Sequence, residues 1–283
     1  MNQIPPPSLG EHPDIETATQ FVSQIYSVML DEVDDAQYSS AELEMMRDTV
    51  MYYGRYLKPG TRYYFEQTVI PPIAAAVNYV TANGPATVLD LGCGLGMQSI
   101  IFALAGCRVI AVDIRPSCIA LCNKRKQYFE ERFGQKLDIE FLCENFAEFS
   151  SADRESSIDA VFSMSAFSYI LPLQDTVKKL SKLSRPDARV FLFEENIDHF
   201  YAALFRRRNI PGPRAVKEAF EAEGFAGGTP AGTCAIPKQV WSITAMRPII
   251  SMLDRVLRKS IRLAFSYKLS MQRVADPTAT VID

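Results

Sequence analysis

The stretch that decides the fold is Val88-Leu89-Asp90-Leu91-Gly92-Cys93-Gly94-Leu95-Gly96-Met97-Gln98-Ser99-Ile100. It begins as a short apolar run typical of a buried strand, turns through glycines at alternate positions and continues into an apolar segment that predicts a helix. Glycine tolerates positive φ and lets a ligand lie against bare backbone. A strand, a glycine turn and a helix N-terminus in this order predict a small-molecule site with outward-directed backbone N–H groups.

A second apolar run, Val109–Val112, ends in Asp113. In such folds an acid about 20 residues beyond the glycines holds a ribose diol. The glycine pattern itself is Asp-x-Gly-x-Gly-x-Gly, which differs from the Gly-x-Gly-x-x-Gly of dinucleotide sites. The leading Asp90 would repel a pyrophosphate and attract an ammonium or a sulfonium. The pattern therefore favours a cationic nucleoside over a dinucleotide.

The segment Asp90–Gly96 closely resembles motif I of the class I S-adenosylmethionine-dependent methyltransferases. The resemblance implies an α/β, Rossmann-like fold whose seven-stranded, mostly parallel sheet has an antiparallel last strand beside the fifth. It implies S-adenosylmethionine as the cofactor, with Asp90, Gly92 and Gly94 along its methionine part and Asp113 on its ribose. The full set of implied cofactor-binding residues is Asp90, Gly92, Cys93, Gly94, Gly96, Asp113, Ile114, Asn145, Phe146 and Ser163.

The predicted third strand, Ile139–Leu142, is followed by a departure from the family pattern. In the family an acid after this strand binds the adenine amino group, and a neighbouring backbone N–H meets the ring. Asn145 stands in the place of that acid, and its side-chain carbonyl can still accept a hydrogen bond from the amine. The departure bears on adenine recognition and leaves the cofactor class unchanged.

The chain divides into a flexible arm over residues 1–13, a helical cap over 14–83 and an S-adenosylmethionine-binding domain over 84–283. A hydrophobic content of 48% is ordinary for a globular protein with a full core. In the cap, Ser39 and Glu42 form a possible capping box for a helix that continues to Tyr53. Aromatic faces attract cations, so Tyr64, together with Arg62, is a candidate for contacts with the sulfonium pocket.

Several classes of function are disfavoured by what the sequence lacks. A net charge of −3 gives no field for nucleic-acid binding, and the fourth strand, Ile158–Ser163, is not followed by the Asn/Asp-Pro-Pro-Tyr/Phe of base and glutamine methyltransferases. No apolar run approaches the ~18 residues of a membrane span. The six cysteines form no Cys-x-x-Cys pair, which predicts reduced thiols in a cytoplasmic protein and no metal site.

Two polar residues follow the predicted fifth strand, Arg189–Glu194, at the edge of the sheet where ligands bind. Glu195 and His199 are the catalytic candidates there, because a neutral imidazole is the usual general base near pH 7. We expect a methyltransferase that acts on a small organic acceptor, at a hydroxyl or carboxyl oxygen. Two alternatives stay open: a non-catalytic partner or scaffold with this fold, and an NAD-dependent oxidoreductase.

The last third of the chain contains a predicted sixth strand around Thr233–Ser242, a closing strand over Phe265–Met271 and, between them, a basic amphipathic helix at about 248–264. Ile249, Leu253 and Val256 lie on its apolar side, with arginines elsewhere on the helix. Such a helix can lie on an anionic membrane surface or bind an acidic partner. We favour instead an inserted helix that packs on the domain or closes the pocket, with its arginines in solvent.

Overall fold

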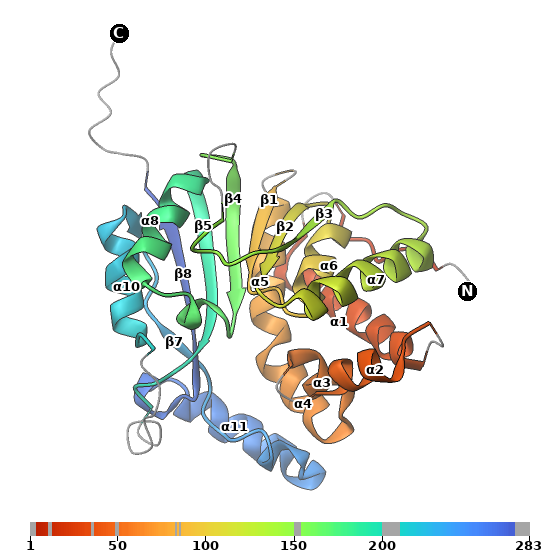
Figure 1. The fold of residues 1–283 in the computed structure, drawn as a ribbon. Coiled ribbons are helices and arrows are strands. Elements are labelled where there is room, and N and C mark those ends of the chain that lie inside the picture. Colours follow the sequence, from red (N-terminus) through yellow and green to blue (C-terminus); the bar gives the residue numbers. More distant parts are fainter. Residues whose placement is uncertain are drawn as a thin grey trace.

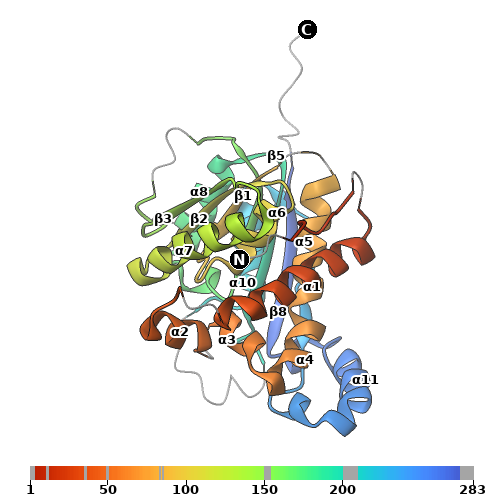
Figure 2. The same ribbon diagram turned by 90° about the vertical axis from the view of Figure 1, so that its right-hand side faces the viewer.

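The computed structural model describes residues 4–10, 13–34, 37–48, 51–82, 84, 86–149, 154–199 and 210–274. Within these ranges the chain forms one twisted sheet with helices on both faces (Figures 1 and 2). Parts of the predicted arm and the end of the predicted domain, residues 1–3, 11–12 and 275–283, lie outside the described residues. The division into arm, cap and domain stays a prediction.

The sheet has eight strands among the described residues, in the order β3-β2-β1-β4-β5-β8-β6, with β7 pairing to β8. Strands β1 to β5 are parallel, and β8 runs antiparallel beside β5. This confirms the Rossmann-like class and its antiparallel last strand. The strands are β1 (Thr87–Leu91), β2 (Arg108–Asp113), β3 (Ile139–Cys143), β4 (Ile158–Met164), β5 (Ser184–Glu195), β6 (Phe225–Ala226), β7 (Ala231–Cys234) and β8 (Ser266–Arg273).

Helices cover the two faces of the sheet and build the cap. The helices are α1 (Ile15–Asp31), α2 (Ser40–Arg47), α3 (Tyr52–Leu57), α4 (Pro59–Thr68), α5 (Ile70–Ala82), α6 (Met97–Leu104), α7 (Pro116–Phe133), α8 (Leu173–Leu183), α10 (Pro213–Ala222) and α11 (Arg247–Leu257). Successive side chains of β1 point to opposite faces of the sheet. Val88 packs with the cap and α6 on one face, and Leu89 packs with α8 and α10 on the other. The parallel strands point toward the side of the molecule where α4 and α11 lie (Figure 1).

Three sequence predictions are corrected by the structure. The capping box of Ser39 and Glu42 is present, but its helix ends at Arg47, and a separate helix begins at Tyr52. The sixth strand is shorter and earlier than predicted, because β7 covers Ala231–Cys234 and the residues around Trp241 form a 3-10 turn. The sheet has eight strands among the described residues, where seven were predicted, because the two-residue strand β6 pairs with β8.

A buried ion pair fastens the cap to the domain. Arg125 of α7 and Glu32, just after α1, have no exposed side-chain surface, and their atoms Nε and Oε1 lie 2.8 Å apart. Tyr38 and Tyr53 of the cap each donate a hydrogen bond to the same carboxylate at 2.8 Å. Arg125 also donates to the carbonyl of Leu95 in the glycine turn. The cap is thus tied directly to the segment that decides the fold.

Candidate active site

The turn after β1 needs glycine at each of its alternate positions. Gly92, Gly94 and Gly96 have φ of 69°, 57° and 71°, which is left-handed backbone that side chains disfavour. The N–H of Gly92 donates to the carbonyl of Val112 at 2.8 Å, which folds the turn back onto β2. A Cβ on Gly92 would lie 2.1 Å from the Cβ of Ala166. The turn therefore presents bare backbone at the carboxyl ends of the parallel strands.

Asp90 brings a buried carboxyl to the base of this turn. Its side chain is 2% exposed, and the hydroxyl of Ser99, in the first turn of α6, donates to it at 2.6 Å. Burial raises the pKa of Asp90 to about 7, and the nearby charge of Asp113 adds to the shift. A positive ligand would favour the ionised form. The site therefore fits an ammonium or sulfonium group.

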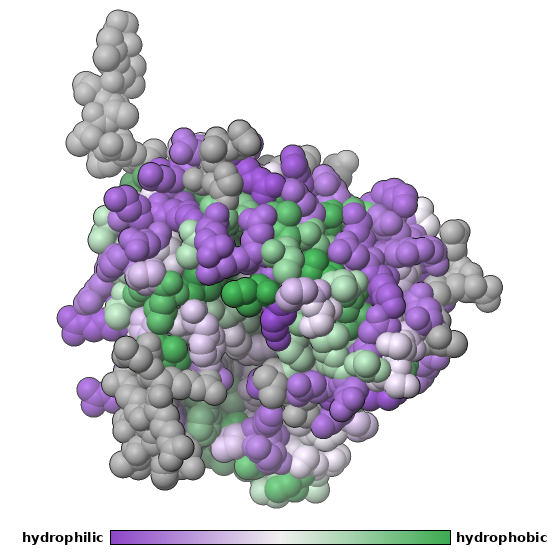
Figure 3. All heavy atoms as spheres, in the orientation of Figure 1, coloured by the Kyte–Doolittle hydropathy of each residue, from purple (hydrophilic) through white to green (hydrophobic). Residues whose placement is uncertain are grey.

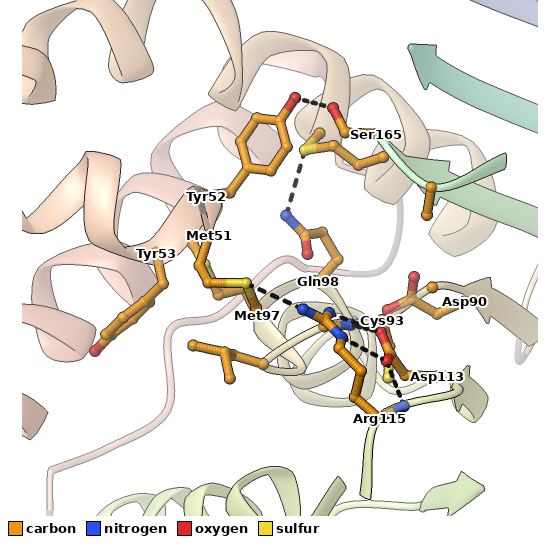
Figure 4. Close-up of a pocket in the computed structure, with 15 residues that line it drawn as sticks. Met51, Tyr52, Tyr53, Asp90, Cys93, Met97, Gln98, Asp113, Arg115 and Ser165 are labelled. Atoms are coloured by element: carbon orange, nitrogen blue, oxygen red, sulfur yellow. Dashed lines mark hydrogen bonds and ion pairs between the residues drawn. The ribbon is translucent and has the colours of Figure 1, made fainter. Parts of the chain in front are cut away.

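Asp113, at the end of β2, is held by four hydrogen bonds. The N–H of Gly94 donates to it at 2.9 Å and the N–H of Arg115 at 3.0 Å. The Arg115 guanidinium binds both carboxylate oxygens, at 3.0 and 3.1 Å, and lies 3.4 Å from the sulfur of Met51 (Figure 4). A carboxylate has about four lone-pair positions, so a ribose diol at Asp113 would take the place of the guanidinium. The Arg115 side chain is 47% exposed and can move away into solvent.

Two adjoining cavities lie at the carboxyl ends of β1, β2 and β4. The inner cavity, of about 180 Å³, lies between the glycine turn and the cap, and the outer one, of about 510 Å³, lies beside β2 and the segment after β3. Five residues line both cavities: Gly92, Asp113, Arg115, Ser165 and Ala166. The two cavities therefore adjoin along these residues, and together they make up the hollow at this edge of the sheet.

The cap supplies one wall of the inner cavity through Met51, Tyr52 and Tyr53. The hydroxyl of Tyr52 is hydrogen-bonded to that of Ser165, which follows β4 (Figure 4). Burial raises the pKa of Tyr52, so this phenol stays protonated at neutral pH. Ser165 has φ of 55°, an uncommon backbone for a residue with a side chain. This hydroxyl pair is a polar spot in a wall that is otherwise rich in methionine.

Glu194, near the end of β5, shapes the loop that carries Ser165. Its buried carboxyl group accepts hydrogen bonds at 3.1–3.2 Å from three consecutive backbone N–H groups, those of Ala166, Phe167 and Ser168. Burial raises the pKa of Glu194 to about 7. The loop geometry at the cavity is thus set by a side chain from the neighbouring strand.

Eight of the ten predicted cofactor residues line the hollow. Asp90, Gly92, Cys93, Gly94 and Asp113 line the inner cavity, and Gly92, Asp113, Ile114, Asn145 and Phe146 line the outer one. Gly96 and Ser163 line neither: Gly96 caps α6, and the hydroxyl of Ser163 donates to the carbonyl of Leu91 at 2.9 Å. The cofactor contacts of these ten residues stay predictions.

Asn145 uses its side-chain carbonyl locally, since this oxygen accepts a hydrogen bond from the N–H of Ala147 at 3.1 Å. If Asn145 also bound the adenine amino group as predicted, the same oxygen would accept both hydrogen bonds. Ile114, by contrast, is 64% exposed at the outer cavity, where it presents an apolar surface suited to a flat base.

Glu195 is the last residue of β5 and His199 follows the strand, but neither lines the inner or the outer cavity. His199 is 2% exposed and stacks on Phe265, with 4.1 Å between ring centroids. Burial lowers the pKa of His199, so its neutral form dominates at pH 7. Glu195 is exposed at the end of β5. Their catalytic roles stay predictions.

The cap candidates Tyr64 and Arg62 also lie away from the lining. Tyr64 packs edge-on against Trp241, with ring centroids 6.0 Å apart, and Arg62 lies over the ring of Tyr56. The cap residues that line the cavity are Met51, Tyr52 and Tyr53. Sequence reasoning did not single out Tyr52 and Ser165, because their contact joins residues 113 positions apart. It also missed Arg115, although this residue binds Asp113 only two positions away. The tyrosine-rich composition of the cap is the one signal that pointed toward Tyr52.

Three comparisons with known proteins bear on this site. Residues 89–192 match a family model described as a methyltransferase domain. A cypemycin N-terminal methyltransferase from Streptomyces is 47% identical over 62 residues, which is 20% of this chain and 25% of that protein. A ubiquinone biosynthesis O-methyltransferase from Aromatoleum aromaticum is 32% identical over 118 residues, or 42% and 47% of the two chains. The chain thus spans half or less of the curated relatives that it matches.

A solved structure shares the fold over most of the chain. Phosphoethanolamine N-methyltransferase 2 from Haemonchus contortus, in complex with S-adenosyl-L-methionine, aligns with a TM-score of 0.55 at 13% identity. The alignment covers 84% of this chain and 61% of that one. Fold and site define an α/β protein with a hollow at the carboxyl ends of its parallel strands. The match over residues 89–192 and the shared fold are consistent with a class I S-adenosylmethionine-dependent methyltransferase and support S-adenosylmethionine as the cofactor.

The remaining predictions about the surroundings of the site concern metals, thiols and membranes. The described residues contain no group of three or more metal-ligating side chains. All six cysteines are free thiols. Among the described helices, none combines the length and the apolar character needed to cross a bilayer.

Proposed function

We propose that the protein transfers the methyl group of S-adenosylmethionine to a hydroxyl or carboxyl oxygen of a small organic acceptor. The observation that carries the proposal is the inner cavity, in which Asp90 and Asp113 flank a bare glycine turn and the cap forms the facing wall. The acids suit the cationic and hydroxylated ends of the cofactor. The cap wall offers apolar surface and hydroxyl groups to an acceptor.

S-adenosylmethionine, when bound, supplies a methyl group that its sulfonium has already activated. The chain then has to align the acceptor with that methyl group and keep water away, and alignment of this kind lowers a barrier by several kcal/mol. We assign the ammonium end to Asp90 and the ribose to Asp113. The outer cavity, with Ile114 and Phe146, would take the adenine.

We propose that the Tyr52 and Ser165 hydroxyls orient the oxygen of the acceptor. Both line the inner cavity and bond to each other, so an acceptor hydroxyl that came between them could form a hydrogen bond to each. His199, with Glu195, remains our proposed general base. Its neutral imidazole can accept a proton, and it acts only if the acceptor extends from the inner cavity toward the end of β5.

Calorimetry with S-adenosylmethionine, S-adenosylhomocysteine and NADH tests the cofactor site. We expect binding of the first two and none of NADH. Methyl transfer from radiolabelled S-adenosylmethionine to phenols, carboxylic acids and amines then tests the acceptor class, and mild alkaline hydrolysis separates methyl esters from ethers. Transfer only to amines would refute the oxygen assignment. Cofactor binding without transfer to any acceptor would support the alternative of a non-catalytic partner or scaffold.

Two variants separate the proposed roles near the acceptor. Tyr52→Phe removes one orienting hydroxyl, and we expect a lower kcat with unchanged affinity for S-adenosylhomocysteine. His199→Asn removes the proposed base, and we expect kcat to lose its dependence on the imidazole pKa. A His199→Asn protein with the pH profile of the parent would exclude the imidazole as the base.

We further propose a cytoplasmic location, which the six free thiols support.

A further inference from the structure

Helix α11 contacts the rest of the protein along one narrow side. Ile250 is 4% exposed and packs with Ile236 and Trp241. One turn later, Asp254 is 2% exposed, and its carboxylate accepts hydrogen bonds from the N–H groups of Ala235 and Ile236 at 2.7 and 3.0 Å. The sequence predicted that Ile249, Leu253 and Val256 would pack on the domain, but the packed positions are those of Ile250 and Asp254.

The opposite side of α11 carries an exposed apolar stripe. Ile249, Met252, Leu253 and Val256 follow the i, i+3, i+4, i+7 spacing of one helix face, and their exposed fractions are 46%, 59%, 45% and 60%. Of fourteen exposed large apolar side chains in the described residues, nine lie between positions 240 and 263: Val240, Ile243, Met246, Ile249, Met252, Leu253, Val256, Leu257 and Leu263. Apolar patches of this size on a folded surface mark a contact site.

The same segment is strongly basic. Residues 238–262 contain six cations, Lys238, Arg247, Arg255, Arg258, Lys259 and Arg262, within a chain of net charge −3. The one acid of the segment, Asp254, points into the protein. Arg55 and Lys58 of the cap lie close enough to contribute, after burial, to the lowered pKa of Lys238. Cations from two parts of the chain therefore gather around Lys238, at the start of the basic segment.

We propose that residues 240–263, with α11 at their centre, dock on an anionic phospholipid membrane. The stripe would enter the boundary between headgroups and acyl chains, and the surrounding lysines and arginines would contact the acidic headgroups. Charge complementarity selects this occupant, because two copies of so basic a surface would repel each other. Figures 1 and 2 show α11 projecting at one end of the molecule, and apolar and hydrophilic side chains lie side by side there in Figure 3. The proposal does not depend on methyl transfer.

Flotation of the full-length protein with vesicles tests the proposal. We expect the protein to float with vesicles of phosphatidylcholine and phosphatidylserine, to float weakly with phosphatidylcholine alone, and to dissociate as salt is added, because salt screens the headgroup charge. Equal binding to both kinds of vesicle, or no binding to either, would overturn it.

Two pairs of matched variants assign the binding to α11. Ile249→Gln should weaken partitioning roughly tenfold by removing one buried apolar side chain, while Ile15→Gln, at a 51% exposed isoleucine in the first turn of α1, should leave it unchanged. Lys259→Glu should weaken it about fivefold or more, while Lys178→Glu, on the exposed side of α8, should not. Circular dichroism checks that all four variants fold.

A measurement of the oligomeric state can refute the membrane proposal. Light scattering after gel filtration should give a monomer for the parent and for Ile249→Gln. A parent dimer that Ile249→Gln dissociates would show that the stripe meets a second copy, and the membrane assignment would be wrong. Calorimetry with S-adenosylhomocysteine on the same preparations keeps this result separate from the proposed function.

Discussion

The cap and α11 are both helical additions to the sheet, and they are attached in opposite ways. The cap is fixed by Arg125 and Glu32, an ion pair with no exposed side-chain surface, and by hydrogen bonds that converge on it. Helix α11 is held at Ile250 and Asp254 and leaves its apolar stripe outside. A buried pair tolerates few arrangements, because each charge needs its partner. The comparison indicates that the cap is a fixed wall of the cavity, while α11 leaves an apolar surface exposed, which we propose as the membrane contact.

Breaking the cap attachment should have the largest effect. Arg125→Met leaves the Glu32 carboxylate buried without its partner, and we expect a loss of about 3–5 kcal/mol in the free energy of unfolding. Urea denaturation measures it. Arg154→Met, which breaks a half-exposed pair with Glu140, should cost less than about 1 kcal/mol. Similar losses in the two variants would mean that the buried pair does not fix the cap.

Removing the polar anchor of α11 should cost less. Asp254→Ala leaves the N–H groups of Ala235 and Ile236 without their acceptor, at a cost of about 1–3 kcal/mol. Asp254→Asn retains an acceptor oxygen and is the matched control. Hydrogen exchange should show faster opening in α11 than in α1. Uniform loss of protection across both helices would contradict a separate attachment for α11.

Burial of Asp90 gives the site a pH dependence. The folded-state pKa of Asp90, about 7, lies above its ordinary value of 3.8, so the folded protein binds this proton more tightly than the unfolded chain does. Without ligand, the unfolding free energy should therefore fall as pH rises from about 4 to 7. A cationic ligand needs the ionised form. Its affinity should rise with pH, by up to about tenfold per unit, and level off above about pH 7.

Calorimetry of S-adenosylmethionine binding between about pH 5.5 and 7.5 checks this expectation. Asp90→Asn, which cannot ionise and retains an acceptor for Ser99, is the control. It should bind more weakly at neutral pH and lose the slope. A parent protein with a flat profile would mean that the Asp90 carboxyl does not face the positive end of the cofactor.

A smaller effect is expected where the cap touches Arg115. Its guanidinium occupies the Asp113 oxygens that we assign to the ribose, so Arg115→Ala should tighten S-adenosylhomocysteine binding by up to about fivefold, the value of a half-exposed ion pair. Arg108→Ala, at an exposed arginine that begins β2, is the control and should change nothing. Weaker binding by Arg115→Ala would show that the guanidinium contacts the cofactor directly.

Local patterns in the sequence predicted the parallel sheet and eight of the residues that line the hollow. The segment from Val88 to Gly96 contains its own strand, glycine turn and acid, so a local pattern is enough to identify it. The pairs Arg125–Glu32 and Tyr52–Ser165 join positions 93 and 113 residues apart, and no local pattern reveals them. Periodicity showed that α11 is amphipathic, but it could not tell which side faces inward. The buried hydrogen bonds of Asp254 decide that, and they depend on the loop after β7.

The smallest expected effect on stability tests most directly whether the apolar stripe of α11 is exposed, in contrast to the packed cap. Ile249→Gln changes an exposed side chain of α11 and should move the free energy of unfolding by no more than about 0.5 kcal/mol, because surface substitutions away from packed features cost little. Ile250→Gln, the next residue and 4% exposed, should cost about 2 kcal/mol or more, because it buries a polar group in an apolar cluster. Urea denaturation of the two variants compares the sides of one helix. If Ile249→Gln cost as much as Ile250→Gln, the stripe would be packed in solution and could not serve as a free docking surface.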